Sequence, residues 1–223
     1  NTGDELVVPG EKLKSGQIYE SNSYTLEALL KNLGMQTHRL GIVKDDLNST
    51  QQALLKGTEE ADCIISSGGV SIGDADYIKT AVENLGKLSV WKLAIKPGKP
   101  FSFGRVGETP FFGLPGNPVA VFVTFLMLVQ PYLLKKQGAK NIYPEKYFMP
   151  AGFEVSDESG RQEYIRVRLK RSLQGRQELI RFTNQGSSVM TSTSWADGLA
   201  IIPINSKIEK GDLLEFIPFT GLL

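Results

Sequence analysis

Apolar residues in the first two thirds of the chain alternate between helical and extended spacing. In residues 22–33 they recur every three or four positions, which predicts a helix that ends before Gly34. Further helices are predicted over residues 49–60, with Ser49 as N-cap, and over residues 76–86 and 118–137. Short apolar runs predict strands over residues 37–43, 62–67, 90–95, 101–104 and 110–114.

Strands that alternate with helices predict an α/β domain with a mostly parallel sheet and helices on both faces. Ligands of such sheets bind beyond the carboxyl ends of the strands. Polar or glycine-rich segments are expected at those ends, and they cover residues 3–5, 44–46, 67–69, 96–99 and 115–118. The pattern therefore predicts one ligand site to which five loops contribute.

After about Tyr143 the pattern changes to short alternating runs separated by turns. The runs cover residues 164–169, 178–182, 198–203 and 212–216. This spacing, without a long helical stripe, predicts a small all-β unit, either a barrel or a sandwich. The chain also starts as a loop that would normally follow a buried strand, so we expect it to be a fragment of a longer protein.

Composition excludes several classes of protein. The 223 residues include 25 basic and 24 acidic side chains, and a net charge of +1 does not favour nucleic acid or an anionic membrane. The apolar run of residues 119–129 is shorter than the ~18–20 residues that a membrane span needs. No signal peptide pattern is visible at the N-terminus. Because Cys63 is the single cysteine, we expect a reducing compartment, the cytoplasm.

The segment of residues 66–77 joins a predicted strand to a predicted helix. Its glycines, Gly68 and Gly69, allow backbone amides to approach an anion, and Ser67 and Ser71 add hydroxyl groups, so the loop suits a phosphate. It lacks the ending of a P-loop. Either of two aspartates here, Asp74 and Asp76, suits a divalent cation or a water molecule. The alternative is a tight turn in which Asp76 caps the helix.

Lys92, Lys96 and Lys99 form a second candidate site, framed by Pro97 and Pro100. Proline fixes the backbone, so the loop directs ammonium groups toward one region, where they suit a phosphate or an oxyanion. The alternative is an ordinary cluster of surface lysines.

Acidic residues and the turn at residues 114–119 are further candidates for the ligand site. The acidic residues in neighbouring loops are Asp4, Glu5, Asp45 and Asp46, whose hard oxygens suit Mg²⁺ better than zinc. The amides of the turn could face an anion, or the turn could simply connect a strand to a helix. His38 is the single histidine and lies in a predicted strand, which excludes a histidine-based triad. We interpret Cys63 as a small core residue.

Four of these motifs, in this order, resemble the MoeA-type molybdopterin molybdenumtransferases, whose eukaryotic relatives include the E domains of gephyrin and the plant Cnx proteins. The motifs cover residues 3–6, 66–77, 92–100 and 114–118. The resemblance implies a three-layer, MogA-like molybdopterin-binding α/β domain over residues 1–143, whose first strand is missing, and a small β-barrel domain over residues 144–223. It also implies that two upstream domains are absent.

The resemblance further implies a reaction in which molybdate is inserted into adenylylated molybdopterin with Mg²⁺ dependence and release of AMP. It assigns Glu5, Asp45 and Asp76 to Mg²⁺ and to hydrolysis of the adenylate. Lys92 and Lys96 match basic residues near the pterin phosphate. The residues that match the family's oxyanion-binding residues are Lys96, Lys99, Arg166 and Ser187. Pro115 and Pro118 match residues that shape the wall of the pocket.

The family forms homodimers whose sites borrow residues from the partner's upstream domains, so we expect this chain alone to bind the pterin without turnover. Contact with the adenylyltransferase is a further expectation. One alternative is a MogA-type molybdopterin adenylyltransferase, which lacks the β-barrel and the paired motifs of residues 96–100 and 115–118. The other is a scaffold that binds receptor tails, like gephyrin's E domain. Asn1 stands where the family has serine.

Overall fold

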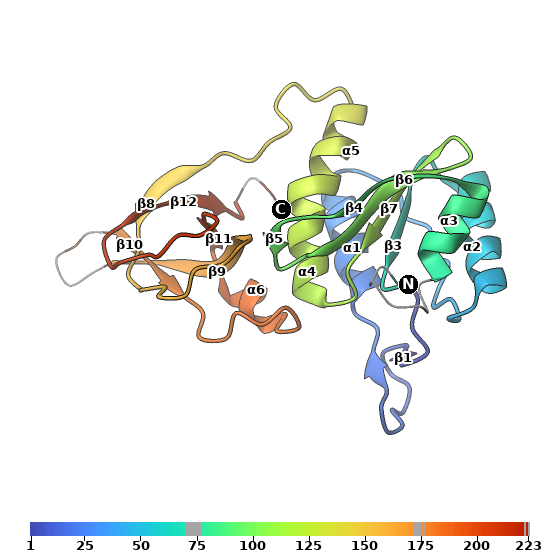
Figure 1. Ribbon diagram of the computed structural model, residues 1–223, viewed down its shortest axis with the longest axis horizontal. Coiled ribbons are helices and arrows are strands. Elements are labelled where there is room, and N and C mark those ends of the chain that lie inside the picture. The colour runs from blue at the N-terminus through green and yellow to red at the C-terminus, as the bar shows by residue number, and fades with distance from the viewer. Residues whose placement is uncertain (70–76, 172–174, 176, 221, 223) are drawn as a thin grey trace. The chain divides into compact units, whose positions relative to one another are not determined.

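The computed structural model describes residues 1–69, 77–171, 175, 177–220 and 222, which form two compact units. The first unit contains Asn1–Leu93 and Gly98–Phe125, and the second contains Ala94–Pro97 and Leu126–Leu223. The chain therefore crosses between the units after residues 93, 97 and 125. Figure 1 shows the elements of each unit.

A four-stranded sheet with the order β3-β7-β6-β4 forms the centre of the first unit (Figure 1). Its strands are β3 (Ile64–Ser67), β4 (Gly86–Lys92), β6 (Pro100–Val106) and β7 (Thr109–Leu114). The β3–β7 pair is parallel, whereas β6 is antiparallel to both β7 and β4. The expectation of a mostly parallel sheet is therefore wrong for this sheet. A turn as short as the one between β6 and β7 can join only antiparallel strands.

Helices cover both faces of this sheet, as the sequence predicts. On one face α2 (Leu47–Glu60) and α3 (Tyr77–Leu85) pack on the strands through a cluster that includes Leu54, Ile78 and Phe111. On the other face α4 (Pro118–Thr124) packs against β7, and α1 (Asn22–Asn32) packs against α4 (Figure 1). The unit thus has three layers.

The predicted helix over residues 22–33 is confirmed, and it ends as a glycine stop should. The N–H of Gly34 donates to Lys31 O at 2.9 Å and the N–H of Met35 donates to Leu30 O at 3.0 Å. The helix α2 begins earlier than predicted, because Asp46 and not Ser49 is its N-cap. The Asp46 carboxylate accepts from the Ser49 N–H at 2.8 Å.

The predicted strand over residues 37–43 is wrong, since within it only Val43 pairs, in a single bridge with Thr2. His38 is exposed and lies in no strand. Cys63 precedes β3 and is only partly buried, so it is not a core residue. His38 is flanked by Thr37 and Arg39, and Cys63 is preceded by Asp62, so the apolar pattern at these positions is too weak to fix the ends of a strand.

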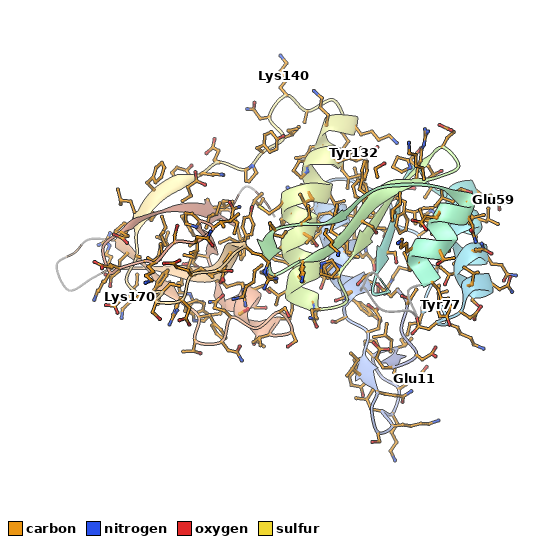
Figure 2. All side chains as sticks on the ribbon, in the orientation of Figure 1. Glu11, Glu59, Tyr77, Tyr132, Lys140 and Lys170 are labelled. Atoms are coloured by element: carbon orange, nitrogen blue, oxygen red, sulfur yellow. The ribbon has the colours of Figure 1, made fainter. Side chains whose placement is uncertain are left out.

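A short pair of strands that the sequence did not predict extends the first unit. The strands β1 (Leu6–Val7) and β2 (Ile18–Tyr19) are parallel, and the intervening segment forms a projecting loop (Figure 1). Figure 2 labels Glu11 in this loop, as well as Glu59 near the end of α2 and Tyr77 at the start of α3. Ile18 and Tyr19 are exposed although they are apolar.

The long helix predicted over residues 118–137 is confirmed. It consists of α4, a π-helical turn η1 (Phe125–Val129) and α5 (Gln130–Lys136). By length and composition this helix could cross a membrane, with a mean hydropathy of 1.6. The apolar run of residues 119–129 is shorter than the helix, so the sequence pattern underestimated the length of the apolar segment. However, 67% of its most apolar stretch is buried within the protein, as in the core helix of a globular domain.

The second unit is built on a sheet with the order β10-β9-β11-β12-β8, in which these strands are antiparallel. The predicted strands are confirmed as β9 (Gln162–Arg171), β10 (Gln177–Arg181), β11 (Gly198–Ile202) and β12 (Leu213–Pro218). The strand β8 (Tyr147–Pro150) and the short helix α6 (Thr191–Trp195) were not predicted. A bridge from Ala151 to Leu179 joins the two ends of the sheet and closes a barrel.

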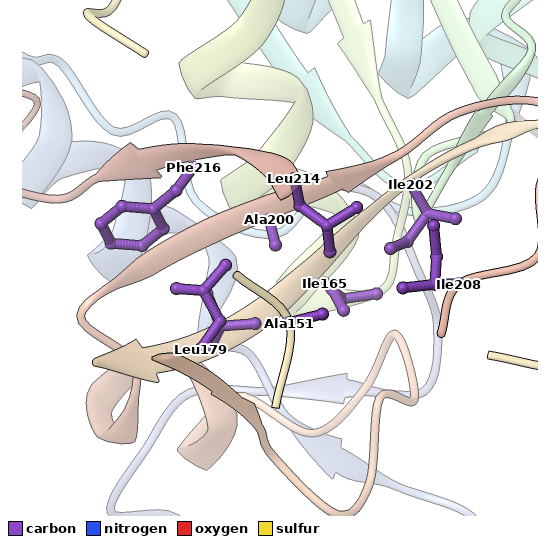
Figure 3. Packing of buried hydrophobic residues seen from close by; sticks show 9 residues of the cluster. Ala151, Ile165, Leu179, Ala200, Ile202, Ile208, Leu214 and Phe216 are labelled. Atoms are coloured by element: carbon purple, nitrogen blue, oxygen red, sulfur yellow. The ribbon is translucent and has the colours of Figure 1, made fainter. Parts of the chain in front are cut away.

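One strand of the second unit comes from a distant part of the sequence. The predicted strand over residues 90–95 divides into β4 and β5 (Ile95–Lys96), and β5 pairs in parallel with β9. The barrel interior is filled by nine buried apolar residues (Figure 3). They are Ala151, Ile165, Val167, Leu179, Ala200, Ile202, Ile208, Leu214 and Phe216.

Candidate functional site

Two acidic loops of the first unit are tied together by reciprocal hydrogen bonds. The N–H of Asp4 donates to the Asp45 carboxylate, and the N–H of Asp45 donates to the Asp4 carboxylate, both at 3.3 Å. Both residues are exposed, as is Glu5. The structure therefore brings together the loops of residues 3–5 and 44–46, as the sequence predicts.

The Asp45 carboxyl group lies among like charges. Partial burial of its carboxyl group, followed by repulsion from Asp4 and Glu5, raises the pKa of Asp45 above its ordinary value, although the Asp4 amide opposes the shift. These hard oxygens and their crowded negative charge suit Mg²⁺. Within the described residues, however, no group of three such side chains is placed to bind a metal ion. Asp76, Asp74 and Ser71 lie outside the described residues.

Asn22 connects three segments at the carboxyl edge of β3 and β7. Its Nδ2 donates to Ser67 Oγ and to Gly116 O, each at 2.7 Å. Ser67 Oγ in turn donates to Pro115 O at 3.2 Å and is buried. The proton of this hydroxyl is thus used by the protein, and the predicted Ser67 and Pro115 loops lie side by side.

Gly68 and Gly69 lie against the N-terminal segment. Both have positive φ, and a Cβ at Gly68 would lie 2.5 Å from Thr2 O, so no larger residue fits. The Gly68 N–H donates to Leu114 O at 3.2 Å. Among the described residues, the buried atoms Thr2 Oγ1 and Asn22 Oδ1 have no hydrogen-bond partner. The edge therefore retains polar atoms that a ligand could satisfy.

The register of the sheet places Lys92 and Lys99 at this same edge. Lys92 pairs with Pro100, and the Leu93 N–H donates to Lys99 O at 3.2 Å. Both lysines are exposed. Strands lie about 4.8 Å apart, so in the order β3-β7-β6-β4 the lysines are two or three strands from Ser67. Pro118 opens α4 at its first turn.

The second unit contains a buried cation that has no carboxylate partner among the described residues. Arg166 in β9 is 1% exposed. Its guanidinium donates to Ser192 Oγ at 2.9 Å, to Tyr164 O at 3.4 Å and to Gly186 O at 3.1 Å. Burial lowers the pKa of Arg166 to about 10, so the group stays protonated at neutral pH. Three neutral acceptors leave the charge of this buried group uncompensated.

The backbone of Arg166 is held just as firmly. The amide side chain of Gln185 accepts from the Arg166 N–H at 2.9 Å and donates to Arg166 O at 3.0 Å. This places the segment from Gln185 through Gly186 beside the guanidinium. Ser187, predicted to share an oxyanion with Arg166, is the next residue along this segment, and the structure brings the two into one region.

Lys96 has a different partner. It lies opposite Glu163 in the β5–β9 register, and its Nζ is 2.9 Å from Glu163 Oε1. Arg166 lies an odd number of positions beyond Glu163, and such side chains start on opposite faces of a strand. The described contacts therefore place Lys96 with Glu163 and Arg166 with neutral groups. Lys99 belongs to the first unit.

Asn22, Gln185 and Ser192 were not found from the sequence. Asn22 looked like the first residue of a helix, and the other two lie in polar segments of the kind that usually face solvent. Each acts by hydrogen bonds between segments that are distant along the chain. No spacing rule within one segment could have revealed them.

Family models match both parts of the chain. A model described as "Probable molybdopterin binding domain" covers residues 1–135, and one described as "MoeA C-terminal region (domain IV)" covers residues 149–219.

Curated relatives match along the same length. A molybdopterin molybdenumtransferase of Haemophilus influenzae is 37% identical, over 100% of this chain and 56% of its own length. One from Nostoc sp. is 40% identical, over 74% of this chain and 39% of its own. The chain thus spans about half the length of the curated relatives that it matches.

A crystal structure of the molybdopterin biosynthesis MoeA protein of Pyrococcus horikoshii is similar in fold. It superposes with a TM-score of 0.80 at 32% identity, and the match covers 98% of this chain and 52% of that one.

Proposed function

Because the chain belongs to the MoeA-type family of molybdopterin molybdenumtransferases, we propose that it acts in molybdenum cofactor biosynthesis. The proposed reaction inserts molybdate into adenylylated molybdopterin with release of AMP. Molybdate, the pterin phosphate and the adenylate are anions, so the protein must offer positive charge and hydrogen-bond donors where they bind.

The observation that carries this proposal is the buried, uncompensated guanidinium of Arg166. A guanidinium has five N–H donors, and neutral acceptors in the described part of the chain take three of them, which leaves two for an oxyanion. A tetrahedral oxyanion can accept from such a pair and would also neutralise the charge. Ser187, in the adjoining segment, is the proposed second contact with the oxyanion.

The edge of the sheet in the first unit is the proposed site for the pterin and its phosphate. Lys92 and Lys99 would supply positive charge there. Lys96 belongs to the second unit and is proposed to add positive charge to the oxyanion site once it leaves Glu163. The open acceptor Asn22 Oδ1 and the open hydroxyl Thr2 Oγ1 are suited to polar groups of the ligand. Pro115 and Pro118 would keep the adjoining wall rigid.

Glu5, Asp45 and Asp76 are proposed to hold Mg²⁺. Support comes from the reciprocal hydrogen bonds that hold the Asp4 and Asp45 loops together beside Glu5. Burial is the main cause of the raised pKa of Asp45, repulsion from Asp4 and Glu5 adds to it, and a cation would relieve that repulsion. When bound, the ion would supply positive charge beside the adenylate phosphate. The chain's own residues orient the anions and need not provide a nucleophile.

The proposal extends to how the protein works as a whole. Residues 1–143 would bind the pterin, and residues 144–223, together with Lys96, would bind the oxyanion. We also propose a cytoplasmic homodimer whose sites need segments beyond this chain, together with contact with the adenylyltransferase.

The deciding experiment supplies adenylylated molybdopterin, molybdate and Mg²⁺ to a form of the protein that includes the upstream domains of its relatives. AMP release with formation of the cofactor supports the proposal. Consumption of ATP with free molybdopterin would instead identify an adenylyltransferase, a reading that the attached barrel disfavours. Capture of receptor peptides without turnover would identify a scaffold.

Binding can be tested on the 223-residue chain alone. Calorimetric titration with tungstate or molybdate should give saturable binding that Arg166→Gln abolishes. Tungstate should also raise the melting temperature of the unaltered chain, because a ligand that binds only the folded state stabilises it. Equal affinity in the variant would contradict the proposed oxyanion site.

A further inference from the structure

Ser192 is the one side chain among the described contacts that accepts a hydrogen bond from the Arg166 guanidinium. The other two acceptors, Tyr164 O and Gly186 O, belong to the backbone. Ser192 Oγ accepts from Nε, the nitrogen nearest the aliphatic stem. A bond at this nitrogen fixes the rotation of the guanidinium plane, and therefore the direction of the outer N–H groups.

The hydroxyl of Ser192 is itself fixed. The residue lies in α6 with 0% exposure, and its Oγ donates to Val189 O at 2.6 Å. Because the proton is used there, a lone pair of the oxygen faces Arg166. A neutral acceptor in this position orients the cation without cancelling its charge. A carboxylate in the same place would compete with the anion.

We infer that Ser192 is a positioning residue that directs the two remaining N–H groups of Arg166 toward the bound oxyanion. The inference rests on the proposed function, since it concerns the same anion. It goes beyond that function by naming how the guanidinium is oriented. A tetrahedral oxyanion needs two correctly directed donors, whereas a spherical anion needs only the charge.

The chain offers a matched control in the next residue. Thr193 also lies in α6, is 7% exposed and donates its hydroxyl to Met190 O at 2.7 Å, the same local bond that Ser192 makes. It has no described contact with Arg166. Thr193→Ala therefore reports the loss of a buried helical hydroxyl without the loss of an acceptor for Arg166.

The experiment is a titration of the 223-residue chain with tungstate, followed by competition of iodide against tungstate. Ser192→Ala should weaken tungstate binding about tenfold, as expected for one hydrogen bond to a charged group, and should leave the iodide affinity within twofold. Thr193→Ala should leave both affinities within twofold. Ser192→Cys keeps the volume but is a weak acceptor, so it should reproduce the loss if the alanine variant does not fold.

The outcomes separate the two proposals. If Ser192→Ala or Ser192→Cys binds tungstate as the unaltered chain does while Arg166→Gln does not, the positioning role is refuted and the oxyanion site stands. Equal weakening of tungstate and iodide would also refute positioning, because it would indicate general damage to the site. If Arg166→Gln keeps its tungstate affinity, the oxyanion site itself fails, and the role of Ser192 fails with it.

Discussion

At Asp45 the folded chain disfavours a negative charge. Burial and the neighbours Asp4 and Glu5 raise its pKa above the ordinary value of 3.8, so the folded state binds this proton more tightly than the unfolded state does. By linkage, the penalty is fully present above the raised pKa and disappears as the pH falls toward 3.8. Asp45→Asn should therefore raise the melting temperature at pH 7 and lose the relative gain on acidification. Mg²⁺ should stabilise the unaltered chain more than the variant.

The neighbouring Asp46 provides a control of opposite sign. Hydrogen bonds from the backbone and the hydroxyl of Ser49 lower the pKa of Asp46 below 3.8. Its stabilising contribution is present above the unfolded pKa of about 3.8 and is lost as the pH falls through the lower, folded value. Asp46→Asn should lower the melting temperature at pH 7, with no change in the effect of Mg²⁺. Thermal melts of both variants from pH 3 to pH 7, with and without Mg²⁺, test the two predictions together. If the melting temperatures of the two variants changed with pH in the same way, both predictions would be contradicted.

The residues that carry the proposed chemistry differ in how far the sequence reveals them. Glycine and proline at residues 68, 69 and 115 mark the edge of the sheet, because few other residues fit those conformations. Arg166, in contrast, lies in an alternating run in which a charged position is expected to face solvent. Its burial depends on Gln185 and Ser192, which lie about twenty residues away or more. The family resemblance, and not the hydrophobic pattern, singled it out.

At the scale of elements, Asn22 joins the start of α1 to the ends of β3 and β7. Asn22→Ala should cost about 1–3 kcal/mol, because Gly116 O and Ser67 Oγ lose their donor in a partly buried place. Urea unfolding measures the loss. Asn32→Ala is the control, since Asn32 is exposed at the other end of the same helix and should change the stability by less than about 0.5 kcal/mol. Equal effects would show that Asn22 does not connect these elements.

The pairing of β5 with β9 places Lys96 against Glu163, and this ion pair restrains a lysine that the proposed function needs. Glu163→Gln should strengthen tungstate binding about two- to fivefold, because a half-exposed pair contributes at most about 1 kcal/mol. Glu215→Gln, which breaks the comparable Lys146–Glu215 pair at 2.7 Å, should leave the affinity unchanged. Calorimetric titration compares the tungstate affinities of the two variants. Weaker binding in Glu163→Gln would contradict the prediction and would mean that the carboxylate supports the site.

Elements could be predicted better than their pairing. Short apolar runs located β3, β7, β9, β10, β11 and β12, but a run of four to six residues carries no information about strand direction. The antiparallel β6–β7 hairpin and the parallel β5–β9 pair are set by turn length and tertiary contacts. The strands β1 and β2 have only two residues each, too few for any period to appear.

At the scale of the whole molecule, each unit has its own tryptophan, Trp91 in β4 and Trp195 at the end of α6. Trp195 packs on Phe182 with ring centroids 5.2 Å apart, and Arg168 lies over its ring. Fluorescence in Trp91→Phe therefore reports unfolding of the second unit, and fluorescence in Trp195→Phe reports unfolding of the first. This separation allows the barrel to be perturbed and both units to be followed.

The barrel closes where the Gly152 N–H donates to Leu179 O at 2.8 Å, and a Cβ at Gly152 would lie 2.8 Å from that same oxygen. Gly152→Val should therefore separate the ends of the sheet and lower the urea midpoint seen by Trp195. The midpoint seen by Trp91 should stay unchanged, because the sheet of the first unit contains no strand from the barrel in the part that the structure describes. Gly160→Val is the control, since a Cβ there meets no atom within 4 Å. Equal shifts in both tryptophan signals would contradict this prediction, because they would show that the two units unfold together. The pterin site and the oxyanion site would then belong to one cooperative unit of unfolding.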